Sequence, residues 1–492
     1  MARNLTDLAS RSHSLEGLDR RLRRWVDFEQ TVNERLINGF FKPAHHRDPA
    51  VQSDFRPEQR PVWNQEVVWL PHDQVRTYGA IDAGLRAAFG VAPPKGRIPF
   101  FLHPQPPASH RRLRLEHGSQ QFPGVAATPT ASYRSVVAWR RDGGGVPVVL
   151  KLSIGALIGR ARRAFRENQI ARAVLISALF DTIPKADRVR LRFDWFAEPA
   201  GVAETRSKTG WLLRRLPHCL AESGTTTVMP VFSLISRRGD HPPHLVELIK
   251  RSKQKPEEFV VERLLRTYVN ALAYLLFEHG LQYEGHSQNV LVELGARDGL
   301  TGVLVLRDLA DTTVNLAFRV AKGRKLPVFP RGFLPEGCPF PIAGNAADYR
   351  CGFAGTRVYR GLLTVEVYGL RGFVWPINTS LARYFKGYDA SRVERRYTEL
   401  WQEAAIEHLG VRPLLRKNRK GLATDEAVAY VLRQVDWRGL GAVPAKLDAA
   451  AEDLLIEGRA RRLTGSVYDH LGCAWGDLYM INGLPGFFRP AF

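Results

Sequence analysis

The 492-residue chain has few cysteines and no long run of apolar residues. Its four cysteines, Cys219, Cys338, Cys351 and Cys473, lie far apart, and no two of them form a CxxC pair. This spacing argues against a zinc site and against a disulfide framework. The longest apolar runs, such as 173–180, are far too short to cross a lipid bilayer.

The amino terminus also lacks the features of a secretion signal. It carries Arg3, Asp7 and Arg11 and continues into the basic run 19–24, so it has no apolar core of the kind that a signal peptide needs. Together with the absence of apolar spans, this composition predicts a soluble cytoplasmic protein without a membrane partner.

Acidic residues are in short supply: Lys and Arg number 71 against 49 Asp and Glu, which gives a formal net charge of +22. A basic balance of this size indicates an anionic partner, although an Arg-rich coding bias explains it equally well. A nucleotide, a polycarboxylate or a nucleic acid would qualify. A basic nucleic-acid-binding protein is one alternative, but the cations are scattered and no nucleic-acid-binding module is recognisable, so we expect no nucleic acid.

The length and the hydrophobic content of 45% predict a packed core and two to four domains or subdomains. Apolar residues recur at helical spacing over 13–38. The runs 135–139 and 146–151 flank a Gly-rich turn and predict a β-hairpin. Pro256 begins the clearest helix, with two glutamates in its first turn, and Gly280 is placed to end it.

The densest group of polar residues follows this helix. Glu284, His286 and Asn289 lie within the segment 283–289, just before an apolar run, and Asp308 comes nineteen residues after Asn289. So many polar groups beside apolar strands are costly to bury unless they have partners. A lone histidine is most often structural, but this one has a carboxylate two residues before it and an amide three residues after it.

The chemistry of these side chains suits a metal-bound triphosphate. Glu284 and Asp308 offer the hard oxygen ligands that Mg²⁺ prefers over zinc-type ligands, and Asn289 can ligate the metal or orient a ligand. His286 can donate a hydrogen bond to a phosphate oxygen. We therefore predict a nucleotide and Mg²⁺ site at this segment.

Weaker motifs precede this segment. Ser132 and Arg134 lie two residues apart on an extended stretch and so point to the same side. Lys151 ends the second strand of the hairpin, and Arg163 follows twelve residues later. Both cations suit phosphate or carboxylate groups. Taken alone, each of these residues is better explained as a solvated surface residue. His103, in His-Pro-Gln after an apolar run, is the weakest indication of a functional site.

In their order and spacing, these motifs resemble the siderophore synthetases that work independently of non-ribosomal peptide synthetases, the aerobactin-synthetase (IucA/IucC) type. That family reads His-Pro-Trp-Gln, Ser-Leu-Arg-Thr, Lys-Leu-Ser-Leu, Glu-x-His-x-Gln-Asn and Arg-Asp. This chain has counterparts at 103–105, 132–135, 151–154, 284–289 and 307–308. Five matches in one order are specific, whereas any one of them would not be.

The chain departs from the family pattern in three places. The early Gly-His-Pro-x-His-Pro-x-x-Lys-x-Arg segment has at best a degraded counterpart in 39–47. Gly159 stands where the family has Thr, and Gln105 follows His103-Pro104 directly. These departures concern groups that would shape the pocket for the acid.

The resemblance implies a hand-like α+β fold of several subdomains, with a central antiparallel sheet and a helical C-terminal region. Residues 1–95 would form an N-terminal helical, thumb-like region. Residues 96–250 would form a β-rich, fingers-like middle, and residues 251–492 a mostly helical, palm-like C-terminal region. A homodimer is also expected.

The activity that the resemblance implies is that of an ATP- and Mg²⁺-dependent ligase in siderophore or related metallophore biosynthesis. A carboxylic acid, for which we favour a citrate-like polycarboxylate, attacks the α-phosphate of ATP and gives an acyl-adenylate and pyrophosphate. An amine or a hydroxyl group then displaces AMP and forms an amide or an ester.

Each predicted site residue has a role in this reaction. The catalytic residues would be Lys151, Arg163 and His286. Contacts to ATP are expected from Ser132, Arg134, Lys151, Arg163, His286 and Asn289. Mg²⁺ would be held by Glu284, Asn289 and Asp308, and the acid by His103, Ser132 and Arg134.

A kinase-like small-molecule phosphotransferase is the other enzymatic alternative. In that class, a catalytic Asp stands two residues after the His and an Asn five residues further on. Here Gln288 stands two residues after His286 and Asn289 follows at once, so the base is missing from its place. Release of ADP rather than AMP would identify this alternative.

Overall fold

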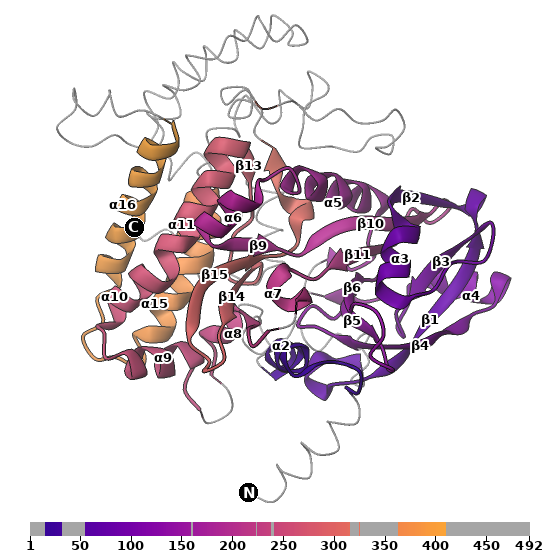
Figure 1. Ribbon diagram of the computed structural model, residues 1–492, viewed down its shortest axis with the longest axis horizontal. Coiled ribbons are helices and arrows are strands. Elements are labelled where there is room, and N and C mark those ends of the chain that lie inside the picture. Colours follow the sequence, from indigo (N-terminus) through magenta and orange to yellow (C-terminus); the bar gives the residue numbers. More distant parts are fainter. Residues whose placement is uncertain are drawn as a thin grey trace, which may run out of the picture.

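The computed structural model describes residues 15–31, 55–158, 161–222, 224–237, 241–314, 324 and 363–409. These residues form two halves that lie side by side (Figure 1). One half is built on an eight-stranded sheet, and the other on a four-stranded sheet with a group of helices. The predicted α+β class, with a large antiparallel sheet and a helical C-terminal part, is confirmed.

The larger sheet is antiparallel throughout. In spatial order its strands are β2 (Val75–Gly79), β10 (Ala197–Glu204), β11 (Gly210–Arg215), β6 (Val148–Lys151), β5 (Ser135–Arg140), β4 (Gln120–Pro129), β1 (Trp63–Pro71) and β3 (Arg97–Leu102). Strands β5 and β6 are the hairpin that the sequence predicts. Helices α3 (Ile81–Phe89), α4 (Ala108–His117) and α5 (Glu167–Phe180) belong to this half.

Successive residues on a strand point to opposite faces, so each strand feeds two separate cores. On β5, Val136 and Ala138 join a core that contains Phe101 and Trp211, whose rings lie 4.8 Å apart. Residues 137 and 139 of the same strand join a different core, which includes side chains of the second sheet. This second face is therefore the junction between the two halves.

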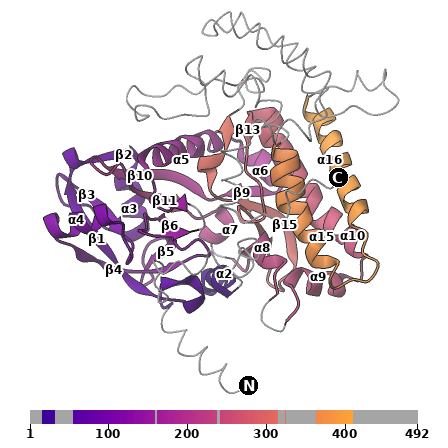
Figure 2. The same cartoon turned by 180° about the vertical axis from the view of Figure 1, so that it is seen from behind.

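The second half contains the smaller sheet, in the order β12 (Thr227–Pro230), β14 (Val290–Leu294), β15 (Leu300–Leu306) and β9 (Phe193–Trp195), with β9 parallel to β15. Figure 2 shows the same arrangement from behind, with the helices gathered at the far end from the large sheet. These helices are α9 (His244–Ser252), α10 (Pro256–Val260), α11 (Arg266–Ala273), α15 (Trp375–Leu381) and α16 (Ala390–Leu409). No described helix is both long and apolar enough to cross a membrane.

The helix predicted after Pro256 is confirmed. It runs through α10, the π-helical turns η5 (Val261–Leu265), α11 and the π-helical turns η6 (Tyr274–Glu278). Gly280 follows with φ +64°, a value that favours glycine, and its N–H closes the last turn onto the Leu276 carbonyl at 3.0 Å. On the buried side of the helix, Tyr268 stacks on Phe373 of η8 (Leu363–Val374), with ring centres 4.0 Å apart.

The N-terminal helix α2 (Arg20–Thr31) lies inside the predicted helical stretch 13–38, whose last seven residues are outside the described part. The large sheet runs across residue 95, since β1 and β2 precede that position and pair with β3, β4 and β10. The division into regions 1–95, 96–250 and 251–492 stays a prediction. Gly159 and the segment 39–47 lie outside the described residues.

Candidate functional site

The antiparallel register sets the predicted site residue Lys151 beside polar residues of the two neighbouring strands. Ser135, at the start of β5, lies opposite Lys151 at the end of β6. On the other side of β6, Arg214 of β11 lies opposite Val149, two residues before Lys151. Side chains two residues apart on a strand share a face. Lys151 and Arg214 therefore point to the same side, which is the junction with the second sheet.

Asp308 comes from the second sheet and joins these two cations. It stands two residues after the end of β15, and its Oδ1 accepts from Lys151 Nζ at 2.5 Å and from an Arg214 nitrogen. The Arg214 guanidinium also donates to Oε1 of the buried Glu198, from Nε at 2.9 Å and from Nη2 at 2.7 Å. This ion-pair network ties the two sheets together where the predicted phosphate site lies.

The charged neighbours of Asp308 and Lys151 shift the pKa values of both groups. Burial acts to raise the pKa of Asp308, but Arg214 and Lys151 outweigh it and hold that pKa well below 3.8. Burial lowers the pKa of Lys151, and the Asp308 carboxylate opposes that shift. Asp308 also adopts φ +61°, which is uncommon for a residue with a side chain and often marks a functional position.

Two further arginines lie beside this network without carboxylate partners. The Arg134 guanidinium and the Lys151 ammonium lie over the ring of Phe165, at 5.3 and 5.2 Å from its centre. Burial, with Arg134 as the second cause, lowers the pKa of Arg163 to about 10. Neither half-buried arginine forms an ion pair with any residue that the structure describes. An anion placed here would gain two charge-assisted contacts.

The segment 283–289 forms a tight turn that faces the same junction. The Tyr283 hydroxyl donates to the carbonyl oxygens of Asn289, at 2.8 Å, and Arg307, at 2.5 Å. Asn289 Nδ2 donates to the Glu284 carbonyl at 3.2 Å, which fixes the amide group within the turn. The turn is thereby fixed to the end of β15, and the two motifs that the sequence separates by nineteen residues become neighbours.

His286 is a neutral hydrogen-bond donor in this setting. Burial lowers its pKa to about 4, although Asp308 opposes that shift. Its Nδ1 accepts from the Gln288 N–H at 3.2 Å, so the proton is assigned to Nε2. Nε2 lies 4.0 Å from a Glu284 carboxylate oxygen. A neutral imidazole with a proton on Nε2 is able to donate to a phosphate oxygen, and this contact stays a prediction.

The assignment of Glu284, Asn289 and Asp308 as Mg²⁺ ligands stays a prediction. Burial, Asp311 and then Asp308 raise the pKa of Glu284 well above 4.5, so three carboxyl groups influence one another here. Among the described residues no group of three or more His, Cys, Asp or Glu side chains is close enough to hold a metal alone. Mg²⁺ commonly takes one or two carboxylates and completes its shell with phosphate oxygens and water, and these residues fit that mode.

His103 is placed differently from the other predicted residues. It is 1% exposed, its ring centre lies 5.5 Å from that of Trp63, and its Nδ1 accepts from the Gln105 N–H at 3.0 Å. Burial lowers its pKa to about 3, and the backbone of Tyr133 is the contact that opposes the shift. His103 thus reaches the Ser132–Arg134 segment only through backbone, and its contact with the acid stays a prediction.

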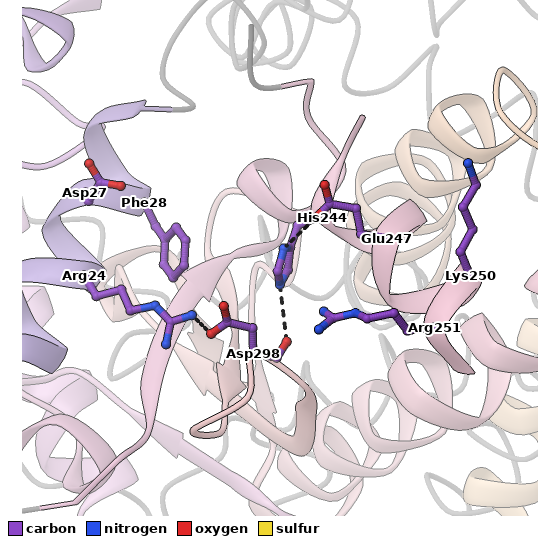
Figure 3. Close-up of a pocket in the computed structure, with 8 residues that line it drawn as sticks. All are labelled: Arg24, Asp27, Phe28, His244, Glu247, Lys250, Arg251 and Asp298. Atoms are coloured by element: carbon purple, nitrogen blue, oxygen red, sulfur yellow. Dashed lines mark hydrogen bonds and ion pairs between the residues drawn. The ribbon is translucent and has the colours of Figure 1, made fainter. Parts of the chain in front are cut away.

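A small polar cavity of about 10 Å³ lies between α2 and the two sheets, with room for roughly one water molecule. It is lined by Ser132, Arg214 and Asp308, among others. A wider pocket of about 630 Å³ lies elsewhere, between α2, α9 and the turn after β14 (Figure 3). The wider pocket contains none of the predicted site residues.

Sequence reasoning did not single out three residues that organise the site. Arg214 and Glu198 form its best-buried ion pair, and Tyr283 fastens the turn. Arg214 had a signal, because it directly follows the apolar run Trp211-Leu212-Leu213, and an arginine that continues a buried strand is costly to bury without a partner. Tyr368 of η8 is a further case, with its ring 6.4 Å from that of His286 and a hydrogen bond to Glu284.

Residues 115–236 match the IucA / IucC family. This match spans the strands that carry Lys151 and Arg214. It also spans Ser132 and Arg134, which lie in the turn between β4 and β5 and not on the extended stretch that the sequence predicts. It confirms the resemblance that the motifs indicate. The comparison with curated proteins finds no match.

Solved structures share the fold. The petrobactin biosynthesis protein AsbB of Bacillus anthracis str. Sterne has a TM-score of 0.57 at 14% identity, over 80% of this chain and 72% of AsbB. ATP-bound aerobactin synthetase IucA from a hypervirulent pathotype of Klebsiella pneumoniae has a TM-score of 0.52 at 14% identity, and the match covers 86% of this chain and 76% of IucA. Aerobactin synthetase IucC from the same pathotype has a TM-score of 0.51 at 15% identity, and the match covers 74% of this chain and 65% of IucC.

Proposed function

We propose that this protein is an ATP-dependent ligase that activates a carboxylic acid and joins it to an amine or a hydroxyl group in siderophore or related metallophore biosynthesis. One observation supports this proposal most: Arg134 and Arg163 lie beside the Lys151–Asp308 ion pair, and neither forms an ion pair with a carboxylate in the described part of the chain. Cations without internal partners at a family motif suit an anionic substrate. The ATP-bound form of the similar IucA is consistent with ATP as that substrate.

The reaction would proceed in two balanced steps. A carboxylate oxygen of the acid attacks the α-phosphorus of ATP, the bond from that phosphorus to the β-phosphate oxygen breaks, and pyrophosphate leaves. The nucleophile then attacks the acyl carbon, the bond from that carbon to the phosphate oxygen breaks, and AMP leaves. The nucleophile loses its proton to solvent or to a basic group.

The side chains divide this work between them. Lys151 and Arg163 would stabilise the negative charge of the triphosphate, and neutral His286 would donate its Nε2 proton to a phosphate oxygen. Arg134 and Ser132 would orient the acid. The rate of the second step would then be raised mainly by proximity, because the activated acid and the nucleophile are held side by side.

Glu284, Asn289 and Asp308 would hold Mg²⁺, which supplies charge neutralisation on the triphosphate when it is bound. A carboxyl group must be ionised to bind the metal, and burial and the neighbouring carboxylates raise the pKa of Glu284. The site would therefore bind the metal more tightly as the pH rises.

The decisive experiment is a screen of di- and tricarboxylic acids with ATP and Mg²⁺, read by pyrophosphate release, AMP formation and trapping of the activated acyl group with hydroxylamine. We expect AMP and pyrophosphate in equal amounts, dependent on the acid. An Arg134→Ala, Arg163→Ala double variant serves as the matched negative control. Acid-dependent formation of ADP in place of AMP would refute the ligase and favour the phosphotransferase.

A further inference from the structure

Helix α2 lies against the face of the large sheet that forms the junction between the two halves. Its apolar residues Leu22, Trp25 and Val26 pack into the core that also holds Val137 and Val149. The same buried side carries a carboxylate, because Glu29 is 0% exposed. A buried carboxylate costs several kcal/mol unless it is well paired, so its partners show what it does.

Each oxygen of the Glu29 carboxylate contacts a different motif. Oε1 accepts from Arg307 Nη1 at 2.6 Å and from the Trp25 indole N–H at 3.0 Å. Oε2 accepts from the backbone N–H of Ala131 at 3.3 Å. One carboxylate thus holds a side chain of the second sheet and the backbone of the first.

Both Arg307 and Ala131 are adjacent to residues of the candidate site. Arg307 Nε donates to the Gln288 carbonyl at 2.9 Å, and its backbone N–H donates to the Asn289 carbonyl at 3.0 Å. The residue after Arg307 is Asp308, which accepts from Lys151. Ala131 immediately precedes Ser132. Glu29 therefore contacts the nucleotide half through Arg307 and the acid half through Ala131.

We propose that Glu29 is a positioning residue, which sets the distance between the triphosphate-binding turn and the acid-binding segment without touching either substrate. The proposal rests on the proposed function for its substrates. The geometry requires a carboxylate of this length, since all three groups that face it are donors. A glutamine would turn an N–H group toward one of them, and an aspartate would fall one methylene short.

The test compares Glu29→Gln with Gln30→Ala, a control on the same helix. Gln30 Nε2 donates to Thr128 Oγ1 and to the Pro129 carbonyl, both at 2.8 Å, so these two hydrogen bonds dock α2 onto the end of β4. Hydrogen exchange of the amides in 131–135 and 286–289 is measured in both variants, together with the Kd for a non-hydrolysable ATP analogue and the KM values for ATP and acid.

In Glu29→Gln we expect faster exchange in both segments and a rise of about ten- to a hundredfold in that Kd, the range for a lost hydrogen bond to a charged group. Both KM values should rise, whereas Gln30→Ala should change each quantity by less than about twofold. If Glu29→Gln does not fold, Glu29→Asp, which keeps the charge, should show the same changes at smaller size.

Equal changes in Glu29→Gln and Gln30→Ala would overturn the proposal, because Glu29 would then only dock the helix. Unchanged exchange in 286–289 would overturn it as well. Neither the exchange nor the analogue Kd requires turnover. A wild-type protein that releases no AMP would therefore refute the proposed function while leaving these two measurements to decide the role of Glu29.

Discussion

Replacing Asp308 with asparagine tests the centre of the ion-pair network. Asparagine has almost the same shape and tolerates a positive φ better than most residues, so the backbone at φ +61° is expected to stay in place. The change therefore removes one negative charge and little else. Lys151 and Arg214 are left buried, with Glu198 as the remaining carboxylate of the network.

The expected loss of stability follows from the burial of these partners. Lys151 and Arg214 have side chains that are 5% and 3% exposed. Removing one member of a buried ion pair costs about 3–5 kcal/mol, because the remaining charge is left uncompensated. The matched control is Asp311→Asn, which breaks a surface pair with Arg172 at 3.0 Å and should cost about 0–1 kcal/mol.

Urea unfolding of the wild type and both variants at pH 7, and again at lower pH, measures this difference. The folded-state pKa of Asp308 lies well below its unfolded value, so its contribution is present above about pH 4 and is lost as the pH falls through the folded pKa. The difference between wild type and Asp308→Asn should therefore shrink below about pH 4.

In one contrary outcome, Asp308→Asn is no more destabilising than Asp311→Asn. In the other, the difference in unfolding free energy between wild type and Asp308→Asn stays constant down to pH 3. Either result would mean that the carboxylate is not ionised against Lys151 and Arg214 in the folded protein.

Three further predictions concern activity. Lys151→Ala and Arg163→Ala should each lower kcat/KM for ATP about ten- to a hundredfold, since a charge-assisted contact to phosphate contributes roughly 1.5–3 kcal/mol; steady-state kinetics measure this. Glu284→Gln should raise the Mg²⁺ concentration needed for half-maximal rate and remove the pH dependence of that value, as Mg²⁺ titrations at pH 6, 7 and 8 would show. Arg134→Ala should raise the KM for citrate in the pyrophosphate-release assay and affect monocarboxylates less, because fewer carboxylates face the guanidinium.

The prediction for ATP kinetics has a control variant, and each of the three predictions has a contrary outcome. Arg263→Ala, on an exposed face of the long helix, should leave the ATP kinetics unchanged. Unaltered kinetics in both Lys151→Ala and Arg163→Ala would remove these residues from the phosphate site. A Mg²⁺ titration identical to wild type in Glu284→Gln would mean a structural carboxyl. Activation of monocarboxylates alone would rule out the citrate-like acid.

The local elements were predictable from the sequence because their patterns are local. The hairpin 135–151 has β-branched runs around a glycine turn, and the helix after Pro256 has a start and a stop that depend only on neighbouring residues. The meeting of Lys151 and Asp308 was not predictable from these patterns. It depends on which face of β6 turns toward the second sheet, and only the strand order and register fix that face.

The roles assigned to charged residues show the same limit. The sequence suggests Lys151 as a free cation for phosphate and Asp308 as a metal ligand, whereas the structure pairs them with each other. The pair does not exclude either role, since an incoming triphosphate and Mg²⁺ would offer each partner a new opposite charge. It does mean that binding must compete with an existing ion pair, so part of the gain is offset.

That competition separates the cations of the site into two kinds. Arg214 is held by Glu198 as well as by Asp308, so it has little to offer a substrate and serves to hold Asp308 in place. Among the residues that the structure describes, Arg134 and Arg163 have no such partners, and burial, together with repulsion from Arg134, lowers the pKa of Arg163 to about 10. An anion bound between them would relieve both costs at once, and this pair of arginines is therefore where substrate charge should matter most.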